Sequence, residues 1–124
     1  MLATGLERQG YIDAYRAVLQ RDRVGLGFSV FIGVKTEGHA NDRALTIEKA
    51  VVAMPEVVAF HLVSGEVDYF LEVVVPDLER YREFLVTKLL DLPIIREVRS
   101  NIAIQTLKAG APLPLGHLDT QARA

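Results

Sequence analysis

The stretch His61–Val75, HLVSGEVDYFLEVVV, contains two apolar runs separated by a Gly-Glu pair. β-Branched and aromatic residues fill both runs, and a short glycine-containing break between such runs is typical of a β-hairpin. We therefore expect strands over Val57–Ser64 and Val67–Val75. The bend of this hairpin carries a glycine, Gly65, and an acid, Asp68, and both need a structural or functional explanation.

The segments on either side of the hairpin alternate between strand and helix patterns. Apolar residues recur at helical spacing after the breaker TEGHAND and again after Pro76-Asp77, and a proline follows each series. These series predict one helix over Asn41–Met54 and a second that begins at Asp77 and ends before Pro93. Further strands are expected where apolar and polar residues alternate. They are Leu26–Lys35, Ile94–Leu107 and an additional N-terminal strand, Tyr11–Leu19.

Without the additional N-terminal strand, the expected order is β-α-β-β-α-β. This order indicates an α+β, ferredoxin-like fold, in which an antiparallel sheet carries two helices on one face. Period two places a mixture of apolar and polar residues on the other face: Ser29, Phe31, Ala59, His61, Asp68, Phe70, Glu72, Asn101, Ala103 and Gln105. Such a mixture is too apolar for solvent and too polar for a monomer core, so we expect the sheet to pack on a second copy of itself.

Composition narrows the class of protein. The 124 residues suffice for one domain, 50% are hydrophobic and 24% are charged, which is typical of a globular protein. The chain has no cysteine, a net charge of −2 and scattered rather than clustered cations, which disfavours a disulfide scaffold and DNA binding by this chain alone. No apolar run approaches the length of a membrane span, so we expect a cytoplasmic protein without membrane contact.

Metal and cofactor sites have little support. The histidines lack a second-ligand spacing such as HxxxH. The GLG at residues 25–27 precedes a strand and lacks the third glycine of a dinucleotide fingerprint. We therefore expect neither a metal ion nor a cofactor.

Several interpretations of the bend stay open. Asp68 beside a turn can accept hydrogen bonds from nearby backbone amides. Alternatively, its carboxylate and the bare backbone at Gly65 can hold a zwitterion, with the acid pairing an ammonium and exposed N–H groups taking a carboxylate. His61 and Asp68 could also form an acid–base pair, although an interface histidine beside a turn-capping carboxylate is the simpler interpretation.

Three segments together resemble the Lrp/AsnC (feast/famine) family of transcriptional regulators. LERQGYIDAYRAVL from Leu6 resembles the hinge strand that follows the family's winged helix. MPEVVAFHLVSGEVDYFLEVVVPDLERYREFLVTKL from Met54 is similar to the heart of the family's effector domain, including its GxxDY pattern. LPLG near Leu113 resembles the family's C-terminal ending, so the resemblance covers about residues 6 to 115.

The resemblance implies a RAM domain (regulation of amino-acid metabolism), also described as a dimeric α+β barrel. It implies a homodimer formed through the sheet, or an octamer of such dimers, and an amino-acid effector bound between dimers at the GxxDY turn. By this carry-over Gly65, Asp68 and Tyr69 match the motif. The other expected ligand-binding residues are neighbours of the motif or a polar pair on the last strand: Leu62, Val63, Ser64, Glu66, Ser100 and Asn101. Glu66 and the following valine differ from the commoner GDYDY, so the identity of the effector stays open.

The helix-turn-helix that precedes the family's hinge has no counterpart in MLATG, so DNA contact is expected only through a domain absent from this chain. The expected divisions are a hinge segment and N-terminal strand (1–20), the RAM domain (21–115) and a disordered tail (116–124). We expect no enzyme but an effector-binding and oligomerisation domain for amino-acid-responsive transcription. The alternatives are a stand-alone amino-acid sensor and a small α+β barrel monooxygenase or isomerase, using His61 and Asp68 beneath the sheet.

Overall fold

The computed structural model describes residues 2–37 and 41–118. Four strands and two main helices follow the order β1-α2-β2-β3-α3-β4, with a short helix in front of β1 and a π-helical segment directly after α3. The elements are α1 (Leu2–Arg8), β1 (Phe28–Thr36), α2 (Asn41–Val52), β2 (Val57–Leu62), β3 (Tyr69–Val75), α3 (Leu78–Phe84), η1 (Leu85–Leu89) and β4 (Ile95–Ile102). None of the helices in these two ranges is long and apolar enough to cross a membrane.

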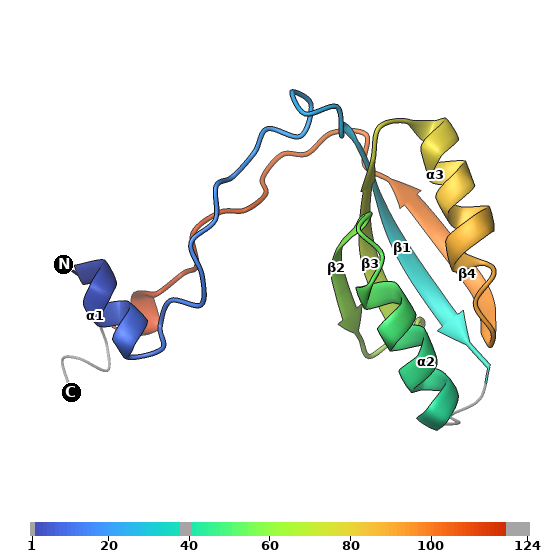
Figure 1. The fold of residues 1–124 in the computed structure, drawn as a ribbon, viewed down its shortest axis with the longest axis horizontal. Helices are drawn as coiled ribbons and strands as arrows, with labels where there is room; N and C mark the ends of the chain where they lie inside the picture. Colours follow the sequence, from blue (N-terminus) through green and yellow to red (C-terminus); the bar gives the residue numbers. More distant parts are fainter. Residues whose placement is uncertain (1, 38–40, 119–124) are drawn as a thin grey trace.

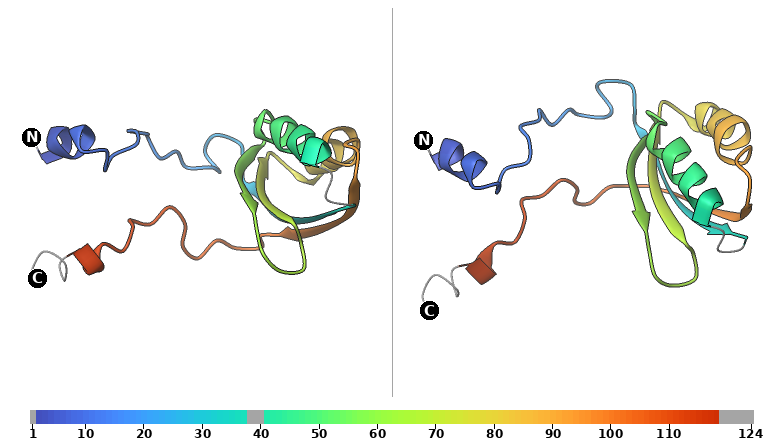
Figure 2. Two further views of the ribbon diagram at one scale, coloured as in Figure 1. Left: turned by 90° about the horizontal axis from the view of Figure 1, so that it is seen from below. Right: turned by 60° about the horizontal axis from the view of Figure 1, so that its bottom comes forward.

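The strands form one antiparallel sheet in the order β2-β3-β1-β4. Figure 1 shows α2 and α3 lying together against one face of this sheet, and Figure 2 shows the opposite face without a helix. We call this second face the outer face. The arrangement is the predicted α+β, ferredoxin-like fold with two helices on one face, and that prediction is confirmed.

The hydrophobic core lies between the sheet and the helices. Val30, Ile32 and Leu71 point toward the helices from the two central strands, and each is at most 1% exposed. Ile47 and Val51 of α2 meet them from the other side. Because the side-chain period of a strand is two, the residues between these core positions point to the outer face.

The second helix begins as predicted but changes its geometry before it ends. The Asp77 carboxylate accepts a hydrogen bond of 2.9 Å from the backbone N–H of Arg80 and so caps α3. Tyr81 and Phe84 of α3 are buried against the sheet. At η1 the ladder shifts to the wider π spacing, and the N–H of Leu90 donates to the carbonyl of Leu85 at 2.8 Å.

The last strand is shorter than predicted. β4 stops at Ile102, after which the N–H of Ala103 donates to the carbonyl of Ser29 at 2.9 Å. Beyond this bond no strand of the described residues pairs with the chain, and Ile104 is 99% exposed. The prediction that the strand continues to Leu107 is therefore wrong, because a strand needs a partner as well as a pattern.

The N-terminal strand predicted over Tyr11–Leu19 does not form in the single chain. We call residues 9–27 and 103–115 the two arms; Figures 1 and 2 show both running away from the sheet in the same direction. Tyr11 is 68% and Val18 91% exposed. The apolar pattern that predicted a strand is present, but the described chain offers this arm no strand to pair with.

The tail expected to be disordered is partly helical. Residues 116–118 form one helical turn, in which the N–H of Leu118 donates to the carbonyl of Leu115 at 3.0 Å. The expectation is wrong for these residues. Residues 119–124 lie outside the described ranges.

Candidate ligand-binding site

Residues 63–68 connect β2 and β3, and we call this segment the hairpin tip. It is longer than the predicted Gly-Glu turn, because β2 ends at Leu62 and β3 begins at Tyr69. A hydrogen bond of 3.0 Å from the N–H of Val63 to the carbonyl of Asp68 closes the tip. Gly65 has a φ of +122°, which side chains rarely tolerate, and a Cβ placed there would meet nothing within 4 Å. Glycine is therefore needed for the turn, and the space beside it is open.

The hairpin tip folds onto the outer face over Gly33 of β1. A Cβ placed on Gly33 would lie only 2.9 Å from Cγ1 of Val67, so this strand glycine makes room for the tip. The N–H of Asp68 also donates to the carbonyl of Val34 at 2.9 Å. Figure 2 shows the connection between β2 and β3 projecting on the side away from the helices. The tip thus lies at the boundary of the face that lacks a covering layer.

The Asp68 carboxylate binds the end of β1. Its Oδ2 accepts hydrogen bonds from the backbone N–H of Thr36 at 2.9 Å and from the hydroxyl of Thr36 at 3.1 Å. This is the capping role that the sequence left open, although the capped amide lies on another strand rather than in the turn itself. Within the described residues Oδ1 has no recorded hydrogen-bond partner, so half of the carboxylate is available to a ligand.

A chain of charges links the hairpin tip to β4. The Arg99 guanidinium donates from Nη1 to Glu66 at 3.0 Å and from Nε to Glu97 at 3.1 Å. The hydrogen bonds with Glu97 and Glu66 raise the pKa of Arg99, and the bond to Arg99 lowers the pKa of Glu97. Lys35 completes the chain with its Nζ 3.7 Å from Glu97. Arg99, Glu97, Lys35 and the Gly33 contact were not predicted as parts of the site; a glycine inside a strand pattern was the available signal for Gly33.

The centre of the outer face is aromatic with a charged border. Phe31 and Phe70 stack with ring centroids 6.1 Å apart. Beside them Arg21, from the first arm, donates to the Glu72 carboxylate at 2.8 Å and to the Ser29 hydroxyl at 3.0 Å. Most of the predicted mixture lies on this face, and Phe31 is in register with Asn101 of β4. Asp68 and Gln105 were predicted there too, but Asp68 lies in the hairpin tip and Gln105 lies beyond the end of β4.

Tyr69 and Leu62 lie on the helix side of the sheet rather than beside Gly65. The Tyr69 hydroxyl donates to Glu48 of α2 at 2.7 Å, and its ring stacks on Phe60 at 5.3 Å. Burial and this hydrogen bond to a carboxylate raise the pKa of Tyr69 to about 12. Leu62 pairs with Tyr69 across the hairpin and is 74% exposed. Tyr69 is therefore part of the packing against α2.

Ser100 and Asn101 are not a pair in space. Ser100 is on the helix side, where its hydroxyl makes a short hydrogen bond with the hydroxyl of Tyr81. Asn101 is on the outer face, in register with Phe31. Neither lies beside the hairpin tip of its own chain, because Asn101 is two residues further along β4 than Arg99, roughly 7 Å at strand spacing. Of the predicted site residues, the structure of the single chain groups only Val63, Ser64, Gly65, Glu66 and Asp68, which all lie in the hairpin tip.

The geometry disfavours an acid–base site in a cleft beneath the sheet. His61 is exposed on the outer face in register with Phe70, whereas the Asp68 carboxylate turns toward Thr36 on the other side of β3. The gap between sheet and helices, lined by Ile47, Leu89 and their neighbours, has no room for a water molecule. Among the described residues no group of three or more His, Asp and Glu side chains could hold a metal ion.

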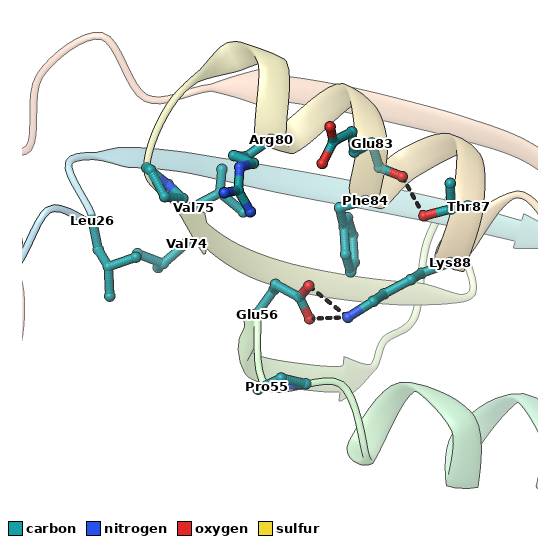
Figure 3. A pocket seen from close by; sticks show the side chains of 11 residues that line it. Leu26, Pro55, Glu56, Val74, Val75, Arg80, Glu83, Phe84, Thr87 and Lys88 are labelled. Carbon is teal, nitrogen blue, oxygen red and sulfur yellow. Dashed lines mark hydrogen bonds and ion pairs between the residues drawn. The ribbon is translucent and has the colours of Figure 1, made fainter.

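Two clefts lie elsewhere on the chain, and the sequence predicted neither. One, of about 530 Å³, is bounded by α3, η1 and the segment before β2 (Figure 3). There Lys88 binds Glu56 with Nζ–O distances of 2.6 and 2.9 Å. Burial raises the pKa of Glu56, but the hydrogen bond from Lys88, a backbone hydrogen bond and the charge of Lys88 together outweigh it, so the net shift of the pKa is downward. The other cleft, of about 760 Å³, lies between the two arms and the outer face.

Comparison with known proteins assigns the chain to a family. Residues 29–113 match the model of the Lrp/AsnC ligand binding domain. The chain belongs to this family. The matched residues include the sheet except Phe28, the hairpin tip and most of the second arm, so the family match covers the residues of the candidate site.

Relatives of this Lrp/AsnC domain are transcriptional regulators. The DNA-binding transcriptional activator DecR of Escherichia coli K12 is 33% identical over 110 residues, which cover 89% of this chain and 72% of that protein. A transcriptional regulator of Neisseria meningitidis, solved as a complex with L-Met, superimposes with a TM-score of 0.88 at 28% identity, covering 94% of this chain and 75% of that one. An AsnC family regulator of Agrobacterium tumefaciens gives 0.87 at 33% identity, with the same coverage. These similarities confirm the predicted family and the Lrp/AsnC effector-binding domain.

Proposed function

We propose that this chain binds a free amino acid at the hairpin tip and self-associates through its outer face, as the non-enzymatic sensing module of a transcriptional regulator. The observation that carries the proposal is the position of the tip. Residues 63–68 fold over Gly33 onto a face that has no covering layer. A ligand held there would lie between the hairpin tip and the second copy that packs on the outer face. Subunit boundaries of this kind commonly form small-molecule sites.

The chemistry of the tip suits a zwitterion. The open space beside Gly65 lets a ligand approach the backbone closely, and the unpaired Oδ1 of Asp68 offers a counter-charge to an ammonium group. The relative from Neisseria meningitidis was solved with L-Met, which fits an amino-acid ligand for this chain as well.

In this proposal one further ligand-binding residue, Asn101, comes from the partner subunit. Asn101 faces outward and can reach a neighbouring subunit's tip, whereas Ser100 and Tyr69 support the fold from the helix side. A dimer through the outer face would also cover Phe31 and Phe70. An octamer of such dimers remains an extension of the same proposal. DNA binding belongs in this account to a separate helix-turn-helix domain, and the chain itself, at net charge −2, is expected to show no salt-sensitive binding to duplex DNA.

Calorimetric titration of the proteinogenic amino acids against wild type and Asp68→Asn tests the proposal. An Asn side-chain oxygen can still accept both hydrogen bonds from Thr36, so the variant changes the charge and little else. We expect binding of the preferred amino acid to weaken by roughly 1.5–3 kcal/mol, the worth of a charge-assisted hydrogen bond.

Thr36→Val is the matched control. It removes the hydroxyl donor to Asp68 but keeps the carboxylate, so it should cost about 1 kcal/mol of stability and leave binding almost unchanged. If an amino acid binds wild type and Asp68→Asn equally well, Asp68 is only the cap of β1, and the proposed contact is wrong. If no amino acid binds wild type, the proposed function itself is wrong.

A further inference from the structure

Arg99 is the one cation of the described residues that contacts the hairpin tip through a recorded ion pair. It lies on the outer face of β4, directly opposite Gly33 of β1. Because Gly33 has no side chain, nothing on β1 stands between Arg99 and the tip, and the Glu66 carboxylate reaches across to Nη1 at 3.0 Å. The contact joins residues 33 positions apart in the sequence.

Glu66 is held by this contact alone. Its side chain is 83% exposed, and within residues 2–37 and 41–118 its recorded partner is Arg99. An ion pair so exposed contributes little net stability, because water and salt compete for both charges. Replacing the Glu66 carboxylate on Arg99 by another carboxylate therefore costs the fold little.

Arg99 has the capacity to take such a carboxylate. A guanidinium presents five N–H donors in a planar fork that matches a carboxylate, and the recorded bonds to Glu66 and Glu97 use only Nη1 and Nε. Glu97 lies on the same strand and keeps Arg99 oriented toward the tip, while Lys35 on β1 is 3.7 Å from Glu97. The Arg99 guanidinium is thus held in place to bind an anion by Glu97, and this orientation does not depend on Glu66.

We propose that Arg99 binds the α-carboxylate of the amino-acid ligand, and that Glu66 occupies this place on Arg99 when no ligand is bound. The inference rests on the function proposed above and adds the residue that recognises the ligand's acid end. Asp68, whose carboxylate is bound to Thr36 of β1, and Arg99, opposite Gly33 of β1, then bind the two ends of one zwitterion. Binding breaks the Glu66–Arg99 pair. The ligand carboxylate then takes the place of Glu66 on Arg99, at the subunit boundary.

The test compares L-methionine, the ligand of the solved relative, with L-methioninamide, which lacks the carboxylate charge. Both are titrated calorimetrically at slightly acidic pH, where the amine is protonated, against wild type, Arg99→Gln, Glu66→Gln and the control Arg96→Gln. Arg96 is an exposed arginine of the same strand. If the panel of amino acids shows a tighter binder than methionine, that amino acid and its amide serve as the pair.

Wild type and Arg96→Gln should prefer the acid over the amide by roughly tenfold to a hundredfold, the value of one charge-assisted hydrogen bond. Arg99→Gln should lose this preference while still binding the amide as wild type does. Glu66→Gln should bind the acid a few-fold more tightly, because the internal competitor is gone. A purely structural role of Arg99 would weaken acid and amide alike.

Two results would overturn the inference, and they differ from the failure of the proposed function. An unchanged preference for the acid in Arg99→Gln shows that another group binds the carboxylate. Weaker binding of the acid in Glu66→Gln shows that Glu66 supports the ligand rather than competing with it. The absence of any amino-acid binding to wild type would instead reject the proposed function, and this inference with it.

Discussion

The two faces of the sheet differ in what covers them. Toward the helices, Val30 and Ile32 of β1 are fully buried by α2 and α3. On the other side the neighbouring residue, Phe31, stacks on Phe70 but is covered only in part, and the charged residues Arg21 and Glu72 border the pair. The helices of this chain cover one face of the sheet, and no helix of the described residues covers the other.

This difference shows what the apolar pattern of the sequence encodes. Alternation along β1 and β3 produces one apolar face, which α2 and α3 cover, and one mixed face with Phe31 and Phe70 at its centre, which no helix of the described residues covers. The two arms show the same property, because their apolar side chains Val18 and Ile104 are 91% and 99% exposed among the described residues. Of the following predictions, the first tests the outer face, the second tests the helix-covered face, and the third, with the smallest expected effect, tests an ion pair at the edge of the helix layer.

The outer face is tested most severely by Phe70→Glu. If a second copy covers this face, the new charge would be buried unpaired, at a cost of several kcal/mol, and the assembly should dissociate. Size-exclusion chromatography with light scattering measures the mass. Val86→Glu is the control, because Val86 is an exposed apolar residue of η1 in the helix layer, away from the outer face. Equal masses for Phe70→Glu and wild type would remove the outer face from the interface.

Tyr69, the neighbour of Phe70 on β3, tests the face that the helices cover. Tyr69→Phe removes the hydroxyl bound to Glu48 and should cost about 1 kcal/mol of unfolding free energy without changing the assembly mass. The folded pKa of Tyr69 is raised to about 12, so this contribution is present below the unfolded value near 10 and is lost as the pH rises through 12. Denaturant titrations at neutral and alkaline pH check it. A variant whose deficit is the same at both pH values would contradict the assignment.

The smallest effect concerns the Glu56–Lys88 pair of the cleft in Figure 3. Because the folded pKa of Glu56 is lowered, the pair stabilises the fold above the unfolded pKa of a glutamate, and the stabilisation is lost as the pH falls through the folded value. Lys88→Gln should be less stable than wild type by less than about 1 kcal/mol at neutral pH, since both side chains are partly exposed.

The deficit of Lys88→Gln should shrink in acid, once Glu56 is protonated in both proteins. Lys49→Gln, at an exposed lysine of α2, serves as the control and should show no such pH dependence. A deficit that grows in acid would contradict the assigned sign.

The sequence predicted those features that depend on local pattern. The order of strands and helices, the two faces of the sheet and the Asp77 cap all follow from periodicity and turn residues. The contacts that shape the candidate site could not be predicted from periodicity and turn residues, because they join segments that are distant in the sequence. The Asp68–Thr36 bond spans 32 positions and the Glu66–Arg99 bond 33, and both depend on the register between strands.

The same limit explains the wrong strand predictions. The arm over residues 11–19 and the stretch after Ile102 have strand-like patterns, yet no neighbouring strand of the described chain reaches them. Pattern shows that a segment is able to pair, and only the fold shows whether a partner is present. Val18 and Leu19 of the first segment and residues 103–106 of the second line the cleft of about 760 Å³ between the arms and the outer face.

The central claim is that the outer face is completed by another copy of this chain. Sedimentation equilibrium of the wild type over a series of concentrations tests it most directly. The account predicts a mass of at least twice the 13.7 kDa of the chain at micromolar concentration. A mass of 13.7 kDa at every concentration would contradict this claim, because the outer face with its Phe31–Phe70 pair would then be stable in water without a partner.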